Sequence, residues 1–238
     1  MTSDDHRIIR ASSVMALGTV ISRVTGFVRS ILLVATLGTA ILGDAFNVGN
    51  TMPNIIYNLL IGGALAAVFV PQIVRATREQ DGGNAYISAF VTAISSLLLG
   101  ITVVMMFLAP VLVSIYAPTL DGRPREIALS FTLLCLPQIF FYGLYGLLGQ
   151  ITNAKERFGP MMWAPIANNV VAIALLSYLL IRYPNLDLST ITDNQVWILG
   201  LGTTLGIVIQ ALVLLPYIRA TGMRLRPTLN WRGMGLRK

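Results

Sequence analysis

Hydrophobic residues gather in six long runs along this chain, and short polar stretches separate the runs. A helix of about 20 apolar residues is long enough to cross the hydrocarbon core of a bilayer. The polar stretches, such as REQDGG and APTLDGRPRE, are rich in the residues that form turns. Each run is apolar on all sides, as expected for helices in lipid. The pattern predicts membrane-spanning helices at 12–38, 45–73, 85–112, 126–150, 161–182 and 195–218.

Composition supports the same class. Of the 238 residues, 55% are hydrophobic and only 11% are charged, whereas a soluble domain carries about 25% charged residues. We therefore predict an all-α integral membrane protein built as one lobe of six transmembrane helices over residues 12–218. An N-terminal tail, 1–11, precedes the lobe, and a basic tail or linker, 219–238, follows it.

The distribution of basic residues predicts the orientation of the lobe. Of the 17 Lys and Arg residues, twelve fall in segments on one side of the predicted membrane and three, Arg123, Arg125 and Arg182, fall on the other side. Cytoplasmic segments of membrane proteins carry the excess of Lys and Arg. Both ends of the chain are therefore expected in the cytoplasm. The basic tail is expected to meet anionic lipid headgroups or to continue into further protein, rather than to bind nucleic acid.

Prolines within or at the ends of the predicted spans indicate kinked or broken helices, because proline lacks the N–H that the helix ladder needs. They are Pro53, Pro71, Pro110, Pro137, Pro165 and Pro216.

Two arginines stand within the first hydrophobic run, in the stretch SRVTGFVRS. The apolar flanks, 11–22 and 30–42, are each too short to cross a bilayer alone. The span must therefore include Arg23, Arg29 or both, although a charge in mid-membrane costs about 2.5–3.5 kcal/mol on insertion scales.

Two interpretations of these arginines are open. If the helix starts near Arg23, Arg29 lies only about 9 Å deeper and its side chain can reach the interface. Alternatively, both side chains border a polar cavity, about 120° apart around the helix axis. No carboxylate lies in this span to neutralise them, and the planar guanidinium suits phosphate. The second interpretation therefore predicts an anionic ligand.

The second run contains a polar stripe. Asn47, Asn50, Asn54 and Asn58 are spaced to lie on one face of a helix. Such a stripe is expected to face a cavity or to join helices by hydrogen bonds. Asp44, just before it, is either an ordinary helix N-cap or a partner for an arginine. The candidate ligand-binding residues are thus Arg23, Arg29, Asp44, Asn50 and Asn54.

The sequence offers no set of residues for catalysis. Its single cysteine, Cys135, and single histidine, His6, have no neighbouring ligand or nucleophile pattern, and no phosphate-binding or dinucleotide motif is present. We expect no cofactor, no metal and no enzymatic reaction.

Four stretches together resemble the N-terminal half of the MurJ/MviN family of lipid II flippases, which belongs to a superfamily of multidrug and lipid-linked oligosaccharide exporters. They are SRVTGFVRS, GDAFNVGNTMPN, GGALAAVFVPQ and LGQITNAKERFGPMMWAPIANN. The resemblance follows the first five predicted spans in order. Ser30 stands where the family often has an acid, and Tyr57 and Asn58 stand where many relatives have arginines.

The resemblance implies two six-helix lobes around a central cationic cavity, with further helices, in the bacterial inner membrane. It implies that lipid II, a lipid-linked pyrophosphate, crosses by alternating access, and that Arg23, Arg29 and Asp44 match family positions. Membrane lipids, a second lobe and cell-wall synthesis proteins are the implied partners. We expect this chain to be one lobe of such a transporter.

Two alternatives stay open at this stage. The chain could belong to an exporter of another lipid-linked sugar or a drug in the same superfamily. It could also be a membrane scaffold for cell-wall enzymes that transports nothing itself.

Overall fold

The computed structural model describes residues 3–38, 41–59, 71–73, 75–76, 83–184 and 186–228, with the backbone alone for residues 3–12. Within these ranges the chain is helical, joined by turns and short non-helical segments. The longer helices are α1 (Ser3–Leu37), α2 (Ile41–Tyr57), α4 (Asn84–Phe107), α5 (Ala109–Tyr116), α6 (Arg123–Cys135), α7 (Gln138–Ala154), α8 (Gly159–Arg182), α9 (Asp193–Leu212) and α10 (Leu214–Ala220). The chain is an all-helical membrane protein, as its hydrophobic pattern predicts.

Five stretches of the described residues are long and apolar enough to cross a membrane. They are Ser13–Leu37, Asn84–Phe107, Arg123–Ala154, Gly159–Arg182 and Asp193–Ala220. Each coincides with one of the predicted spans. The remaining predicted span, 45–73, begins within α2, but residues 60–70 lie outside the described part of the chain.

Three prolines mark breaks in the helices, as predicted. Pro110 opens α5 after the chain leaves α4, Pro137 separates α6 from α7, and Pro216 lies in α10 just after the break from α9. Helix α8 instead continues through Pro165. Proline at position 165 cannot donate to the carbonyl of Met161, four residues earlier. The Tyr145 hydroxyl of α7 donates to that carbonyl at 2.8 Å, so the neighbouring helix satisfies the freed acceptor. Helix α2 likewise continues through Pro53.

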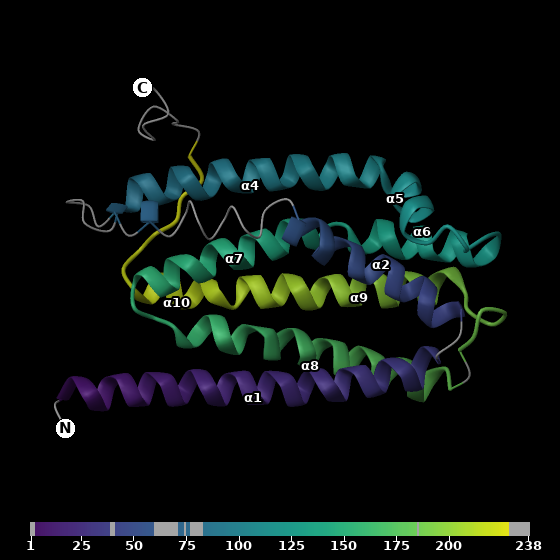
Figure 1. The fold of residues 1–238 in the computed structure, drawn as a ribbon, viewed down its shortest axis with the longest axis horizontal. Coiled ribbons are helices and arrows are strands. Elements are labelled where there is room, and N and C mark those ends of the chain that lie inside the picture. The colour runs from purple at the N-terminus through teal and green to yellow at the C-terminus, as the bar shows by residue number, and fades with distance from the viewer. Residues whose placement is uncertain are drawn as a thin grey trace.

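The helices lie side by side in a bundle, with α1 at one edge and α4 at the other (Figure 1). Helix α1 packs on α8, α8 on α9, α9 on α6 and α7, and α7 on α4, while α2 packs on α6. The side of α1 away from α8 is exposed and mainly apolar; Val20 and Val24 are each 57% exposed and Phe27 is 68% exposed, and the exposed Arg23 lies among them.

Basic residues of the described chain are distributed unequally between the two ends of the bundle. The start of α8 and the ends of α7 and α10 lie at the same end as the start of α1 (Figure 1). Lys155, Arg157 and Arg219 belong to that end. Arg123 and Arg182 belong to the opposite end, where α6 begins and α8 ends. The two groups separate as the predicted topology requires.

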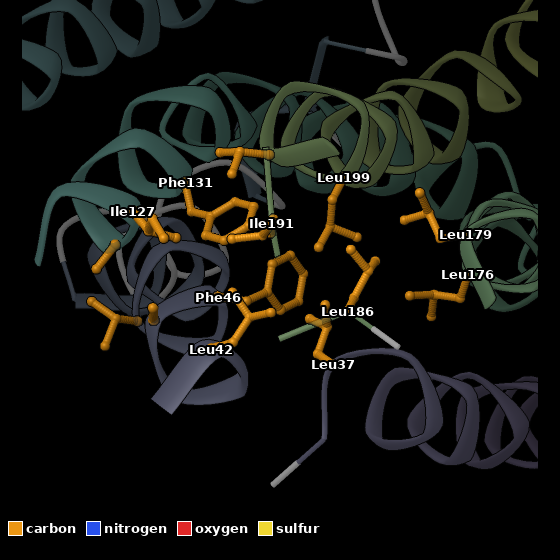
Figure 2. Close-up of a cluster of buried hydrophobic side chains, with 14 of the residues drawn as sticks. Leu37, Leu42, Phe46, Ile127, Phe131, Leu176, Leu179, Leu186, Ile191 and Leu199 are labelled. Atoms are coloured by element: carbon orange, nitrogen blue, oxygen red, sulfur yellow. The ribbon is translucent and has the colours of Figure 1, made fainter. Parts of the chain in front are cut away.

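An apolar core forms where α2 and α6 meet, near the end of the bundle where α6 begins. Figure 2 shows side chains from α1, α2, α6, α8 and α9 converging there, together with Leu186 and Ile191 from the loop before α9. The rings of Phe46 and Phe131 meet edge to face with centroids 5.2 Å apart. Gly49 brings the two backbones close, because a Cβ there would lie 2.6 Å from both Phe131 Cβ and the Thr132 nitrogen.

Candidate functional site on helix α1

Helix α1 presents one face to α8, and this face begins with small residues. A Cβ at Gly18 would lie 2.8 Å from Nε1 of Trp163, and Gly26 lies next to Asn169. Small residues let helix backbones approach in a membrane, where apolar contact alone gives no preference over lipid. Arg29 follows Gly26 by three residues and so lies on the same face.

Asn169 of α8 joins the two helices by hydrogen bonds. Its Nδ2 donates to the Ser22 carbonyl at 3.0 Å and to the Thr25 hydroxyl at 2.9 Å. The Asn169 side chain is 7% exposed, so these bonds lie away from water. The contact fixes the middle of α1, on the turn that precedes Arg29, against α8.

Arg29 is half-buried and points into the bundle. Its guanidinium lies within electrostatic reach of the Tyr142 hydroxyl on α7 and of the Cys135 thiol at the end of α6. In the part of the chain that the structure describes, no carboxylate forms an ion pair with it. Arg29 is therefore a cation held inside the helix bundle that can bind an anion.

Helix α1 does not start near Arg23, because it begins at Ser3. Ser13–Leu37 is the part of α1 that is long and apolar enough to cross a membrane. Both arginines belong to this stretch.

Arg23 differs from Arg29 in its surroundings. Its side chain is exposed, on a part of α1 turned away from α8. The predicted 120° separation places only Arg29 against α7 and α8. The structure of this lobe therefore does not bring the two guanidiniums together.

The candidate residues of α2 lie apart from both arginines. Asp44 is exposed in the first turn of α2, which begins at Ile41. The N-cap interpretation is therefore wrong, because the apolar residues before Asp44 are already helical. Among the described residues Asp44 also has no arginine partner. Asn50 is half-buried and Asn54 is exposed.

The asparagine stripe of α2 bonds along its own helix. Thr51 donates to Asn47 Oδ1 at 2.9 Å, and Asn58 donates to Asn54 Oδ1 at 2.9 Å. The opposite face of α2 is the one that packs on α6. These bonds do not join α2 to a second helix, so the stripe is an exposed polar face of this lobe.

Sequence reasoning missed Asn169 and Gln138. Asn169 was visible as a polar residue in the span 161–182, but its partners on α1 lie 144 and 147 residues away. Gln138, fully buried at the break between α6 and α7, donates to the Thr204 hydroxyl at 3.0 Å. Within the described ranges its Oε1 has no hydrogen-bond partner. The signal available in the sequence was an amide side chain next to Pro137, within the predicted span 126–150.

The side chains gathered here offer charge and hydrogen bonds. In the described residues, no group of three His, Cys, Asp or Glu side chains is placed to hold a metal ion. An all-helical membrane protein with a cation held inside its helix bundle is typical of transport proteins, because intramembrane charge usually marks a substrate path.

Comparison with known proteins identifies the family. Residues 33–238 match the family described as lipid II flippase MurJ, and the chain belongs to this family. The family is one of transporters and not of enzymes. The resemblance carried by the four sequence motifs is thus confirmed.

Curated relatives extend well beyond the region they share with this chain. The chain is 30% identical over 209 residues to the lipid II flippase MurJ of Burkholderia cenocepacia, which covers 86% of this chain and 39% of that protein. It is 27% identical over 246 residues to a probable lipid II flippase MurJ of Vibrio cholerae, covering 98% and 45%. The chain therefore spans less than half the length of these relatives, and it corresponds to their N-terminal part.

A solved structure shares the fold. The chain superposes on a structure described as lipid II flippase MurJ in an inward closed conformation with a TM-score of 0.66. The match covers 90% of this chain and 43% of that chain, at 16% sequence identity. This likeness shows that the chain shares its arrangement of helices with part of that structure.

Proposed function

We propose that this chain forms the N-terminal lobe of a lipid II flippase and that Arg29 binds the pyrophosphate of the lipid-linked substrate. The observation that carries the proposal is a half-buried guanidinium inside the bundle without a carboxylate partner among the described residues. An unneutralised cation in a membrane is costly, so an anionic ligand that pairs with it explains its presence.

The second arginine and the polar face of α2 fit the same function through a second lobe. Arg23 and the side chains Asn50, Asn54 and Asp44 bind nothing across helices in the described part of this lobe. We propose that they border the cavity that a second lobe closes. Translocation then proceeds by rocking of the two lobes, without covalent chemistry.

The orientation and partners are also part of the proposal. The excess of basic residues at the end of the bundle where α1 begins supports a cytoplasmic position for that end. The membrane is the bacterial inner membrane, and proteins of cell-wall synthesis are the expected protein partners. Substrate binds from the cytoplasmic side and is released on the other side.

Complementation tests this function. In the whole transporter, Arg29→Ala is expected to abolish growth that depends on flippase activity, and Arg23→Ala is expected to impair it. In a binding assay with lipid II, Arg29→Ala is expected to weaken affinity about 10–100-fold, because a hydrogen bond to a charged group contributes about 1.5–3 kcal/mol. Arg182→Ala, at the outer end of α8, is the matched control and is expected to behave as wild type.

Two outcomes would overturn the proposal. Normal growth and normal lipid II affinity in both Arg23→Ala and Arg29→Ala would remove the binding role and favour a scaffold. Loss of binding to a different lipid-linked sugar, with lipid II binding unchanged, would favour an exporter of that other substrate.

A further inference from the structure

A short non-helical segment, 223–228, leaves the end of α10 and crosses to the first half of α4 (Figure 1). The chain reverses at Gly222, whose φ of +83° is in the left-handed region that favours glycine. The segment carries Arg224 and Arg226, and Arg219 lies in the last turn of α10. The turn thus gathers three arginines at the end of the bundle where α1 begins.

Alternate backbone N–H groups of this segment donate to polar side chains one helical turn apart on α4. The bonds, of 3.1, 3.3 and 3.1 Å, join Arg224 to Asn84, Arg226 to Ser88 and Thr228 to Thr92. Two residues of extended chain advance about 6.6 Å, and four residues of helix advance about 6 Å. The two spacings match, so the segment is held in register along α4.

The segment forms a wall shared by two adjoining cavities. The first, of about 540 Å³, is lined by Arg219, Arg224 and Arg226. Ile218 and Met223, each 1% exposed, are among its apolar lining residues. Among the residues that the structure describes, this lining includes no carboxylate. This cavity therefore combines three guanidinium groups with an apolar base.

The second cavity, of about 370 Å³, lies between α4, α7 and the same segment. Its walls are mainly apolar and include Leu99, Phe140 and Leu144, while Arg226 stands at its boundary with the first cavity. Along α4 the lining runs from Ser88 to Leu99, a distance of about 16 Å. One leaflet contributes about half of a 30 Å hydrocarbon core. The second cavity thus has the length of an acyl chain in one leaflet.

We propose that the two cavities form a binding site for an anionic phospholipid. The three arginines bind the phosphate through charge-assisted hydrogen bonds, and the apolar cavity takes one acyl chain. Basic pockets between membrane helices bind anionic headgroups, and no carboxylate among the described lining residues competes for the three guanidinium groups. The site is separate from Arg23 and Arg29, so it does not depend on the proposed transport function.

Native mass spectrometry of the purified 238-residue chain tests the headgroup half of the site. Dioleoyl phosphatidylglycerol is expected to bind at least about tenfold more tightly than dioleoyl phosphatidylcholine. The triple variant R219Q/R224Q/R226Q is expected to remove this preference. The triple variant R123Q/R125Q/R182Q removes the same charge at the other end of the bundle and is expected to keep the preference. Equal loss in both variants, or no loss in the first, would overturn the proposal.

A second pair of variants tests the acyl-chain half. Ser95→Phe places a ring in the second cavity and is expected to weaken phosphatidylglycerol binding about tenfold while leaving thermal unfolding unchanged. Val104→Phe adds the same ring to an exposed position of α4 outside the cavity and is expected to have no effect. Glycerol phosphate, which lacks acyl chains, is expected to bind far more weakly than the lipid. Binding of glycerol phosphate as tight as that of the lipid, or full binding by Ser95→Phe, would show that the cavity takes no chain.

Discussion

Helices α1 and α2 follow one another in the chain, but they are held in the bundle by different kinds of contact. Helix α2 packs on α6 through apolar side chains and through Gly49, which brings the two backbones together. Helix α1 packs on α8 through small residues and the two hydrogen bonds from Asn169. The contact of α2 is apolar and depends on a close fit, and the contact of α1 is polar.

The two contacts have different consequences for the stability of the lobe and for its proposed function. Apolar packing at α2 and α6 leaves no room for a changed side chain, so it fixes that part of the lobe. The hydrogen bonds from Asn169 hold α1 against α8 at Ser22 and Thr25. Arg29, on the next turn, has no carboxylate partner among the described residues. The proposed ligand-binding charge is thus carried by α1, whose contact with α8 is polar and local, while the apolar core lies at the contact between α2 and α6.

The largest effect is expected from adding a methyl group at Gly49. Because its Cβ would lie 2.6 Å from Phe131 Cβ and from the Thr132 nitrogen, Gly49→Ala forces α2 away from α6. Overpacking of this kind costs about 1–3 kcal/mol in the free energy of unfolding. Thermal unfolding of the protein in detergent measures the loss.

Gly100→Ala in α4 is the matched control. A Cβ at that position would meet no atom within 4 Å, and alanine favours helix over glycine by about 1 kcal/mol. We expect its Tm to be unchanged or slightly raised. Equal loss of stability in Gly49→Ala and Gly100→Ala would mean that the α2–α6 contact is not tight.

The two contacts also differ in how far the sequence predicts them. The positions of the spans follow from hydropathy, and the breaks at Pro110 and Pro137 follow from proline chemistry. The 120° between Arg23 and Arg29 follows from helix geometry. Which arginine faces the bundle does not follow, because it depends on where α8 lies against α1.

The start of α2 shows a second limit. Asp44 has the side chain of an N-cap, yet the helix already includes Leu42, which packs into the core with Phe46. Tertiary packing here outweighs a local capping preference, since a cap contributes about 1 kcal/mol and a buried leucine such as Leu42 contributes about 1.5–3 kcal/mol. The partners of Asn169 likewise required the folded arrangement.

A smaller effect is expected at the polar contact. Asn169→Leu removes the donors to the Ser22 carbonyl and the Thr25 hydroxyl, and such bonds between membrane helices contribute about 0.6–1.7 kcal/mol. Trp163 lies against Gly18 of α1, so its fluorescence reports this contact once Trp197 and Trp231 are replaced by Phe. We expect an emission change in Asn169→Leu with a modest fall in Tm.

Asn58→Leu is the control for this prediction. Asn58 is exposed and bonds only along its own helix among the described contacts, so its removal is expected to leave both the Trp163 emission and the Tm unchanged. Unaltered Trp163 emission in Asn169→Leu would show that the small residues alone hold α1 on α8.

The smallest effect is expected in the loop before α9, which adds Leu186 and Ile191 to the core beside α2. Asp187 accepts hydrogen bonds from the Ser189 hydroxyl at 2.7 Å and from the backbone N–H groups of Ser189 and Thr190 at 2.7 and 2.9 Å. The Ser189 hydroxyl bond, followed by the backbone bonds, lowers the pKa of Asp187 below its ordinary value. The charged carboxylate therefore favours the folded loop.

The sign of the pH dependence follows from this lowered pKa. The stabilisation is fully present above the ordinary carboxyl pKa of about 3.9 and is lost as the pH falls through the lower folded-state value. Because the group is exposed, we expect Asp187→Asn to lower Tm by only about 1 °C at pH 7. The difference from wild type should vanish at pH below the folded-state pKa, and Trp163 emission should stay constant throughout. A difference that persists in acid would mean that the side-chain shape, rather than the charge of Asp187, holds the loop on the α2 side of the lobe.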